Sequence, residues 1–223
     1  MRQAFGWTAR KGTAQKEFQK RYTAFIAEYS LRLGKLLDGW WYDGAYTDPV
    51  FHSSRIDTKL FLGAARAGNP NAAVAFNDAS FCTGLCQPVV PGQDYLAGET
   101  EFLLDGKVRY GREKYLPLLT PATHVSQPPR TCLWHCLVSI DCMWEHGIGF
   151  ADWQNPPFKM AKPKRGKMER PLYTVADLET LVRDFKAAGG GVTFNIGIFQ
   201  EGGLGPDTVA QLAKLGSRVR REE

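Results

Sequence analysis

The sequence predicts an α/β fold in which parallel strands alternate with helices. Four stretches with the apolar spacing of amphipathic helices alternate with four short apolar runs of strand length. Polar residues follow the first two runs, Asp43 after one and Asn77 after the other, as at the carboxyl edge of a parallel sheet. A TIM-type barrel normally takes ~250 residues. We therefore expect a partial or atypical (β/α)8 barrel, or an open sheet.

Length and composition indicate one domain spanning residues 1–223. The chain has 223 residues, of which 43% are hydrophobic and 12% aromatic, so it can bury a core. No apolar run approaches the length of a membrane span, and the first residues lack the apolar stretch of a signal peptide. No membrane partner is expected, and the sequence does not reveal the compartment.

The first helix and strand are predicted from residues 13–43. Apolar residues recur with helical spacing and form a stripe that we expect to be buried, while charged residues occupy the other face. The stripe consists of Phe18, Tyr22, Phe25, Ile26, Tyr29, Leu33, Leu36 and Leu37. The aromatic run that follows has strand length and ends at Asp43.

The second helix and strand begin with a capping signal. Ser54 and Asp57 have the spacing of a capping box, and the Gly-Asn-Pro run at residues 68–70 stops the predicted helix. Residues 72–76 form a short apolar run of strand type that ends at Asn77.

A long irregular region, residues 79–130, interrupts the alternation. It is rich in Pro and Gly and too long for a plain connection, and loops of this length are usually functional or disordered. It contains Asp94, Glu99 and Glu101 in an aromatic setting. This loop is therefore a candidate source of a second catalytic carboxylate.

The rest of the chain supplies two more strands and two more helices. The predicted elements are a strand over residues 131–140, a helix from Thr174 to Gly189, a strand over 192–198 and a helix from Gly205. The first of these strands contains Trp134 and His135. A core histidine with a satisfied hydrogen bond is a serious alternative to a functional role for His135.

The run around Asp43 has the composition of a sugar site. Two tryptophans and two tyrosines lie close to this carboxylate in the sequence, among them Trp40, Trp41 and Tyr42. Flat apolar rings pack on the C–H faces of a pyranose while an acid carries out the chemistry. The alternative is an aspartate that only caps the following turn.

Two other classes of function are disfavoured. The net charge is +5, and its densest source is the proline-containing run at residues 159–170, which is better interpreted as a solvated loop than as a nucleic-acid site. Five cysteines are an odd number, and their C-x3-C spacings differ from those of structural zinc sites. We expect neither a nucleic-acid partner nor a bound metal.

Three segments resemble the α-L-fucosidases of glycoside hydrolase family 29. LDGWWYDG at residues 37–44 resembles the family's nucleophile strand, (I/P)D-x-x-W-x-D-G. WHCLVSID at 134–141 resembles its later W-E-x-C-x-(T/S)-I-(N/D) segment. GGGVTFNIG at 189–197, followed by EGGL at 201–204, resembles G-G-N-x-L-L-N-I-G-P-x-x-D-G. The ordered set is much more specific than any one segment.

The resemblance implies a retaining α-L-fucosidase that removes terminal fucose from oligosaccharides or glycoconjugates without a cofactor. Asp43 takes the place of the nucleophile. The acid/base position varies in the family, so Glu99 is the first candidate, Glu101 the second and Glu145 the third. The residues expected to bind the sugar are Trp40, Trp41, Tyr42, Asn77, Trp134 and His135.

The chain also departs from the family pattern. His135 stands where the family usually has Glu, and nothing before Leu36 resembles the family's first strands. We expect the chain to lack those strands, the eighth strand and the usual C-terminal β-sandwich. The alternative function is therefore an inactive or weakly sugar-binding relic of a hydrolase. Half a barrel exposes sheet edges that dimerisation would cover, so a homo-oligomer is left open. Family members are often secreted, periplasmic or lysosomal.

Overall fold

The computed structural model describes residues 3–44, 55–77, 88–98, 103–104, 107–108, 112–119, 126–127, 130–141, 171–199 and 202–220. The chain divides into two compact units, which we describe separately. Unit 1 consists of residues 1–80, 86–98 and 124–134, and unit 2 of residues 81–85, 99–123 and 135–223. The assignment of residues 1–223 to one catalytic domain stays a prediction.

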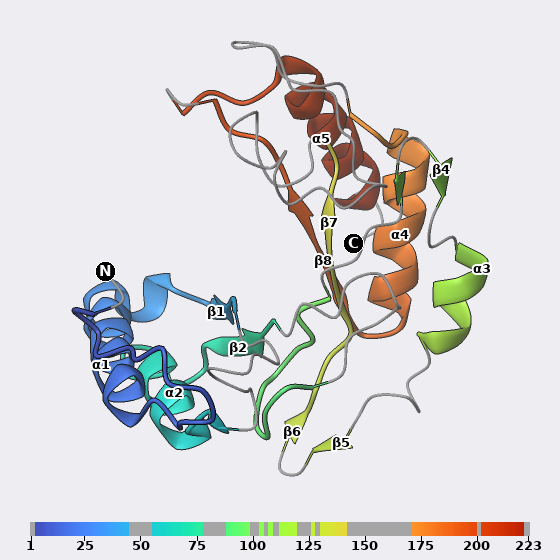
Figure 1. The fold of residues 1–223 in the computed structure, drawn as a ribbon. Coiled ribbons are helices and arrows are strands. Elements are labelled where there is room, and N and C mark those ends of the chain that lie inside the picture. Colours follow the sequence, from blue (N-terminus) through green and yellow to red (C-terminus); the bar gives the residue numbers. More distant parts are fainter. Residues whose placement is uncertain are drawn as a thin grey trace. The chain divides into compact units, whose positions relative to one another are not determined.

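Unit 1 packs two helices against a pair of parallel strands (Figure 1). Its elements are α1 (Lys16–Leu33), the 3-10 turn η1 (Gly34–Leu36), β1 (Gly39–Tyr42), α2 (Thr58–Ala65), β2 (Ala73–Phe76), β5 (Ser126–Gln127) and β6 (Arg130–Thr131). β1 and β2 run parallel, and Tyr42 lies opposite Phe76 at the last paired position. The predicted order of helix, strand, helix, strand is confirmed in this part of the chain.

The core of unit 1 lies between these helices and the strand pair. It consists of Ile26, Tyr42, Phe61, Ala64, Ala65, Val74, Phe76 and Val90. The ring of Tyr42 stacks on Phe76 with centroids 4.8 Å apart and meets Phe61 edge-on at 5.3 Å. Since alternate strand residues point to opposite faces, Tyr42 and Trp40 face the core while Trp41 and Asp43 face the other side.

The buried face of α1 differs from the predicted stripe. The buried residues are Gln19, Thr23, Ile26 and Ser30. By contrast, Phe25 is 44% exposed, Tyr29 48% and Leu36 89%. The prediction that the apolar stripe is buried was therefore wrong for much of the stripe. Three of the four buried residues of α1 are polar.

Hydrogen bonds explain why polar residues fill this face. The hydroxyl of Ser30 donates to the carbonyl oxygen of Ala65 at 2.9 Å and accepts from the N–H of Gly68 at 3.0 Å. A Cβ atom at Gly68 would lie 1.8 Å from the carbonyl oxygen of Ser30. The close approach of α1 to the end of α2 therefore requires a small hydrogen-bonding side chain on one side and glycine on the other.

The start of α2 also differs from the prediction. Asp57 is the N-cap itself, and its side chain accepts from the N–H of Leu60 at 3.2 Å. The N–H of Asp57 donates to Gln19 Oε1 on α1 at 2.6 Å. The acid assigned to the third helical position therefore caps the helix, and Ser54 lies outside the described residues.

Unit 2 contains a second parallel pair with helices against it (Figure 1). Its elements are β3 (Leu103–Leu104), β4 (Lys107–Val108), α3 (Arg112–Tyr115), the 3-10 turn η3 (Leu116–Leu118), β7 (His135–Ser139), α4 (Val175–Ala187), β8 (Gly191–Asn195) and α5 (Pro206–Val219). β7 runs parallel to β8, and α4 packs against both β8 and α5. Thr174 and Asp177 form a capping box at the start of α4.

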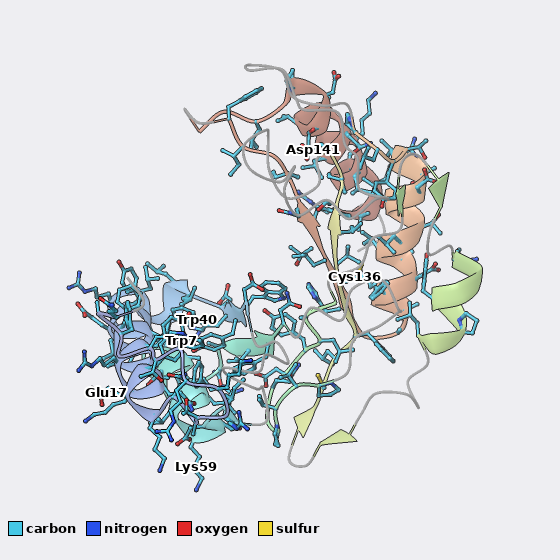
Figure 2. All side chains as sticks on the ribbon, viewed as in Figure 1. Trp7, Glu17, Trp40, Lys59, Cys136 and Asp141 are labelled. Atoms are coloured by element: carbon cyan, nitrogen blue, oxygen red, sulfur yellow. The ribbon has the colours of Figure 1, made fainter. Side chains whose placement is uncertain are left out.

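A buried carboxylate joins the ends of these strands to α5. Asp141, labelled in Figure 2, follows β7 and is fully buried. Its Oδ1 accepts from the N–H of Gly197 at 2.9 Å, and its Oδ2 accepts from the hydroxyl of Thr208 at 2.8 Å. Both carboxylate oxygens therefore have a partner, as a buried acid requires.

The α/β class with parallel strands is confirmed, whereas a closed barrel is not seen. The described strands form two parallel and two antiparallel two-stranded sheets. The TIM-type barrel therefore stays a prediction. Among the described residues, no helix is both long and apolar enough to cross a membrane.

Candidate functional site

The carboxyl ends of β1 and β2 bring two polar side chains together. Tyr42 and Phe76 are paired at the ends of these parallel strands, so the next residues, Asp43 and Asn77, lie side by side. The N–H of Asn77 continues the ladder by donating to the carbonyl oxygen of Tyr42 at 2.8 Å. Its side-chain amide donates to Asp43 Oδ1 at 3.0 Å. The two strand-end residues identified in the sequence are thus in direct contact.

Asp43 combines exposure with a held carboxylate. The residue is exposed, whereas Asn77 is fully buried. The N–H of Gly44 donates to the same Oδ1 at 2.8 Å. Burial, and next the negative charge of Asp43, raises the pKa of the Tyr22 hydroxyl. An accessible anion with two identified donors on one oxygen can act as a nucleophile.

A segment from the predicted loop lies against β1 and β2. The N–H of Asp94 donates to the carbonyl oxygen of Val74 at 2.8 Å, and the hydroxyl of Tyr95 donates to the carbonyl oxygen of Trp40 at 3.0 Å. The indole of Trp41 donates to the carbonyl oxygen of Ala97 at 3.4 Å. Residues 94–97 are thus attached to the sheet rather than forming a free loop.

Asp94 anchors this segment. Its Oδ2 accepts from Arg66 on α2 at 2.5 Å and from the N–H of Val74 at 2.8 Å. The side chains of Arg66 and Asp94 are 18% and 14% exposed, so the ion pair is largely shielded from solvent. Burial, with the Asp94 charge added, raises the pKa of Tyr95 to about 12. Asp94 is therefore committed to structure.

The predicted acid/base candidates follow this segment in the sequence but are not described. Glu99, Glu101 and Glu145 lie outside the described residues. The last described residue of the segment is Gly98, directly before Glu99. The identity of the acid/base therefore stays a prediction.

Trp40, which is labelled in Figure 2, and Tyr42 have a packing role in unit 1. Their rings stack with centroids 6.2 Å apart. The Tyr42 hydroxyl donates to the carbonyl oxygen of Phe61 at 3.2 Å, and burial raises the pKa of Tyr42 far above its ordinary range. The sugar contacts of Trp40 and Tyr42 stay predictions. Trp41 is the aromatic residue of this run that shares a strand face with Asp43.

Trp134 and His135 belong to different units. Trp134 is buried in unit 1, next to Leu133, which forms a parallel bridge with Tyr95. His135 is buried at the start of β7 in unit 2, and its Nε2 lies 2.8 Å from the hydroxyl oxygen of Thr193 on β8. That contact agrees with the alternative of a satisfied core histidine, and a sugar contact for either residue stays a prediction.

The described residues contain no group of three His, Cys, Asp or Glu side chains able to hold a metal ion. Cys132 and Cys136 are buried. Burial raises the pKa of Cys132 to about 12, although a hydrogen bond with Gln93 opposes the rise. This thiol is therefore protonated and unreactive at neutral pH.

Sequence reasoning missed the pairing of Asn77 with Asp43. It assigned Asn77 to a sugar hydroxyl, although both residues directly follow apolar runs of adjacent parallel strands. That shared position was the signal for their contact.

Comparison with known proteins shows that the chain is similar in fold to solved structures of glycoside hydrolases. No protein-family model and no curated protein matches the chain. The solved structure "Endo-fucoidan hydrolase MfFcnA9 from glycoside hydrolase family 107" is 20% identical with a TM-score of 0.62, over 95% of this chain and 38% of that one. "Endo-fucoidan hydrolase MfFcnA4", of the same family, is 18% identical with a TM-score of 0.60, over 98% and 32%. "Endo-fucoidan hydrolase P5AFcnA", also of family 107, is 14% identical with a TM-score of 0.60, over 91% and 56%.

These comparisons bear on the fold and not on activity. The chain spans from about a third to just over half of the three solved chains. All three are glycoside hydrolases, but they belong to family 107 rather than family 29. The specific resemblance to family 29 therefore stays a prediction.

Proposed function

We propose that the chain carries part of the active site of a retaining glycoside hydrolase that acts on α-L-fucosides. The observation that carries the proposal is the exposed Asp43 carboxylate at the carboxyl end of β1, held at one oxygen by Asn77 and Gly44. The fold likeness to endo-fucoidan hydrolases supports the choice of a fucose-containing substrate.

Asp43 is the proposed nucleophile of a double displacement. Its carboxylate attacks the anomeric carbon while the glycosidic C–O bond breaks and an acid protonates the leaving oxygen. The same acid, now a base, takes a proton from water, and the resulting attack on the anomeric carbon releases Asp43. This route needs the two carboxyl groups about 5–5.5 Å apart and uses neither a metal nor an organic cofactor.

Glu99 is the first candidate for the acid/base, with Glu101 and Glu145 as alternatives. The support for Glu99 is the attachment of the preceding segment, in which Ala97 accepts from Trp41, two residues before Asp43 on the same strand face. A loop that continues from this attachment begins close to the proposed nucleophile. For Glu101 and Glu145, no described residue directly before them supports the assignment in the same way.

Trp41 is the proposed wall against which the sugar packs. It is partly exposed and shares a strand face with Asp43. Trp134 and His135 remain proposed contacts from the family resemblance. Trp40 and Tyr42 are proposed to support the wall from the core, consistent with their stacking.

Two modes of cleavage remain, and each has its own support. The resemblance to α-L-fucosidases favours removal of a terminal fucose from an oligosaccharide or glycoconjugate. The three solved structures are endo-fucoidan hydrolases, and their likeness in fold favours cleavage within a fucan chain. The full chain should therefore be assayed both for release of an aryl alcohol from an aryl α-L-fucoside and for new reducing ends from fucoidan.

The Asp43→Ala variant is the control for both assays. Activity of the wild-type chain that disappears in this variant supports the enzyme, and the substrate that reacts identifies the mode. No turnover of either substrate by a folded chain favours the inactive relic. The mass of the chain in solution, measured in the same samples, tests whether the chain forms the homo-oligomer that the sequence leaves open.

A further inference from the structure

We propose that Asn77 is a positioning residue for Asp43, whose carboxylate it holds in the orientation needed for attack. The proposal rests on the nucleophile role proposed for Asp43 and gives Asn77 a role other than binding a sugar hydroxyl. The amide acts through the carboxylate, so it is not itself a catalytic residue.

The strand register makes the contact a consequence of the fold. β1 and β2 are paired up to Tyr42 and Phe76, and the backbone N–H of Asn77 extends this pairing to the carbonyl oxygen of Tyr42 at 2.8 Å. The side chain of Asn77 then lies beside Asp43, and its Nδ2 is 3.0 Å from Oδ1. Asn77 is the residue directly after β2, so it lies beside the residue directly after β1, which is Asp43.

Burial makes the donor a fixed one. Asn77 is fully buried, whereas Asp43 is exposed. A long or exposed donor would have to lose side-chain entropy to hold the carboxylate, but a packed asparagine has already lost it on folding. The sheet therefore supplies a rigid reference for an accessible nucleophile, which is what precise attack requires.

A second donor completes the arrangement on the same oxygen. The N–H of Gly44 reaches Oδ1 at 2.8 Å, and Gly44 has a φ of 81°, a conformation that suits glycine. Two donors from different directions restrict rotation of the carboxylate about its terminal bond. The amide of Asn77 does not titrate, so it can donate to the carboxylate at any pH.

The chain provides a matched control for a buried asparagine. Asn69 precedes β2 and donates through Nδ2 to the carbonyl oxygen of Leu37, which precedes β1, at 3.0 Å. Its side chain is 9% exposed. Asn69 thus links the amino ends of the strand pair as Asn77 links the carboxyl ends, but it has no carboxylate partner in the described contacts.

The first test compares Asn77→Ala, Asn77→Asp and Asn69→Ala in the full chain with an aryl α-L-fucoside. We expect Asn77→Ala to lower kcat roughly 10- to 100-fold with little change in KM, because misplacement of a reacting group acts on the chemical step. Asn77→Asp keeps the volume and can donate while protonated, so its activity should be highest at acidic pH and fall as the two carboxylates come to repel. Asn69→Ala should lower the free energy of unfolding but change neither kcat nor the pH dependence of activity.

The second test places Asn77→Ala in an Asp43→Ala background whose turnover is restored by azide. A residue that acts through Asp43 should have no further effect there, since the group it positions is gone. An equal loss of kcat/KM in both backgrounds would overturn the proposal and assign Asn77 to the sugar.

A nuclear magnetic resonance measurement separates failure of this inference from failure of the proposed function. The side-chain amide signals of Asn77 should move in Asp43→Asn, while those of Asn69 stay in place. If the wild-type chain hydrolyses no fucoside but these signals move, the contact stands and the fucosidase proposal fails. If hydrolysis depends on Asp43 but Asn77→Ala leaves kcat unchanged, only the positioning role is wrong.

Discussion

The indole nitrogen of Trp41 donates a hydrogen bond to the carbonyl oxygen of Ala97 at 3.4 Å. The contact joins β1, the strand directly before Asp43, to the segment that precedes Glu99. Arg66 and Tyr95 fix the same segment through Asp94 and Trp40. The described segment that ends at Gly98 is therefore attached to the strand that precedes Asp43.

The two adjacent tryptophans are expected to respond differently to substitution. Trp41→Ala should lower kcat/KM for an aryl α-L-fucoside roughly tenfold, equivalent to about 1.4 kcal/mol, because the sugar loses its wall. Trp40→Phe should keep kcat/KM, because Trp40 faces the core and its buried indole N–H has no hydrogen-bond partner in the part of the chain that the structure describes. Steady-state kinetics check both variants, and a loss in Trp40→Phe as large as that in Trp41→Ala would contradict the assignment of faces.

Replacement of the three candidate acids should identify the acid/base. Glu99→Gln is expected to lower hydrolysis of a natural linkage by roughly 10²- to 10⁴-fold, as removal of a general acid usually does. An aryl fucoside with a good leaving group should be cleaved with a smaller loss, because that leaving group needs no proton. Glu101→Gln and Glu145→Gln are the matched controls. If one of these, and not Glu99→Gln, has this leaving-group dependence, the assignment moves to it.

Removal of the Tyr42 hydroxyl tests the packing role of this residue. Tyr42→Phe deletes the hydrogen bond to the carbonyl oxygen of Phe61 but keeps the stacking on Phe76. The free energy of unfolding should fall by about 1 kcal/mol, and KM should stay the same. Urea denaturation and fucoside kinetics measure the two quantities. A large rise in KM at unchanged stability would return Tyr42 to the sugar site.

Asp184 gives unit 2 a pH-dependent stability. Burial by itself would raise the pKa of the Asp184 carboxyl, but hydrogen bonds from Arg112 and Tyr115, together with the Arg112 charge, hold it below its ordinary value. Such a group stabilises the fold above its unfolded-state pKa of about 3.9, and this contribution is lost as pH falls through the lower folded-state value.

The expected result is that Asp184→Asn lowers the free energy of unfolding at pH 7, with a difference from wild type that shrinks below about pH 4. Urea denaturation at several pH values checks this. A difference for Asp184→Asn that stays constant down to pH 3 would contradict the role of the Arg112 and Tyr115 contacts.

Local signals in the sequence were sufficient for the four long helices and the four strands of the two parallel pairs. They did not indicate β3, β4, α3, η3 or β5, which lie in the region predicted to be irregular. The capping box of Thr174 and Asp177 begins α4 within one residue of the predicted position, and Gly205 precedes α5 as predicted. Asp43 and Asn77 follow β1 and β2 as the apolar runs indicated. Each of these features depends on residues close together in the chain.

Features that depend on distant partners could not be predicted in the same way. The buried side of α1 includes Gln19 and Ser30 because their side chains form hydrogen bonds with backbone groups of residues 55–68. The aromatic composition of the run predicted a sugar contact for both Trp40 and Trp41. Which of the two rings lies in the core depends on where the helices pack, and the run itself does not show this. Residues 94–97 were predicted to be a loop because they lack the apolar pattern of a strand. The Arg66–Asp94 ion pair attaches them to the sheet instead.

The most direct measurement of the central claim is mass spectrometry of the full chain after incubation with a 2-deoxy-2-fluoro-α-L-fucosyl fluoride, which slows release of a glycosyl-enzyme. The proposed mechanism predicts one added fluorofucosyl group, attached to the peptide that contains Asp43 and absent in Asp43→Ala. A folded chain that hydrolyses α-L-fucosides but carries the label on another residue would contradict the assignment of Asp43 as the nucleophile.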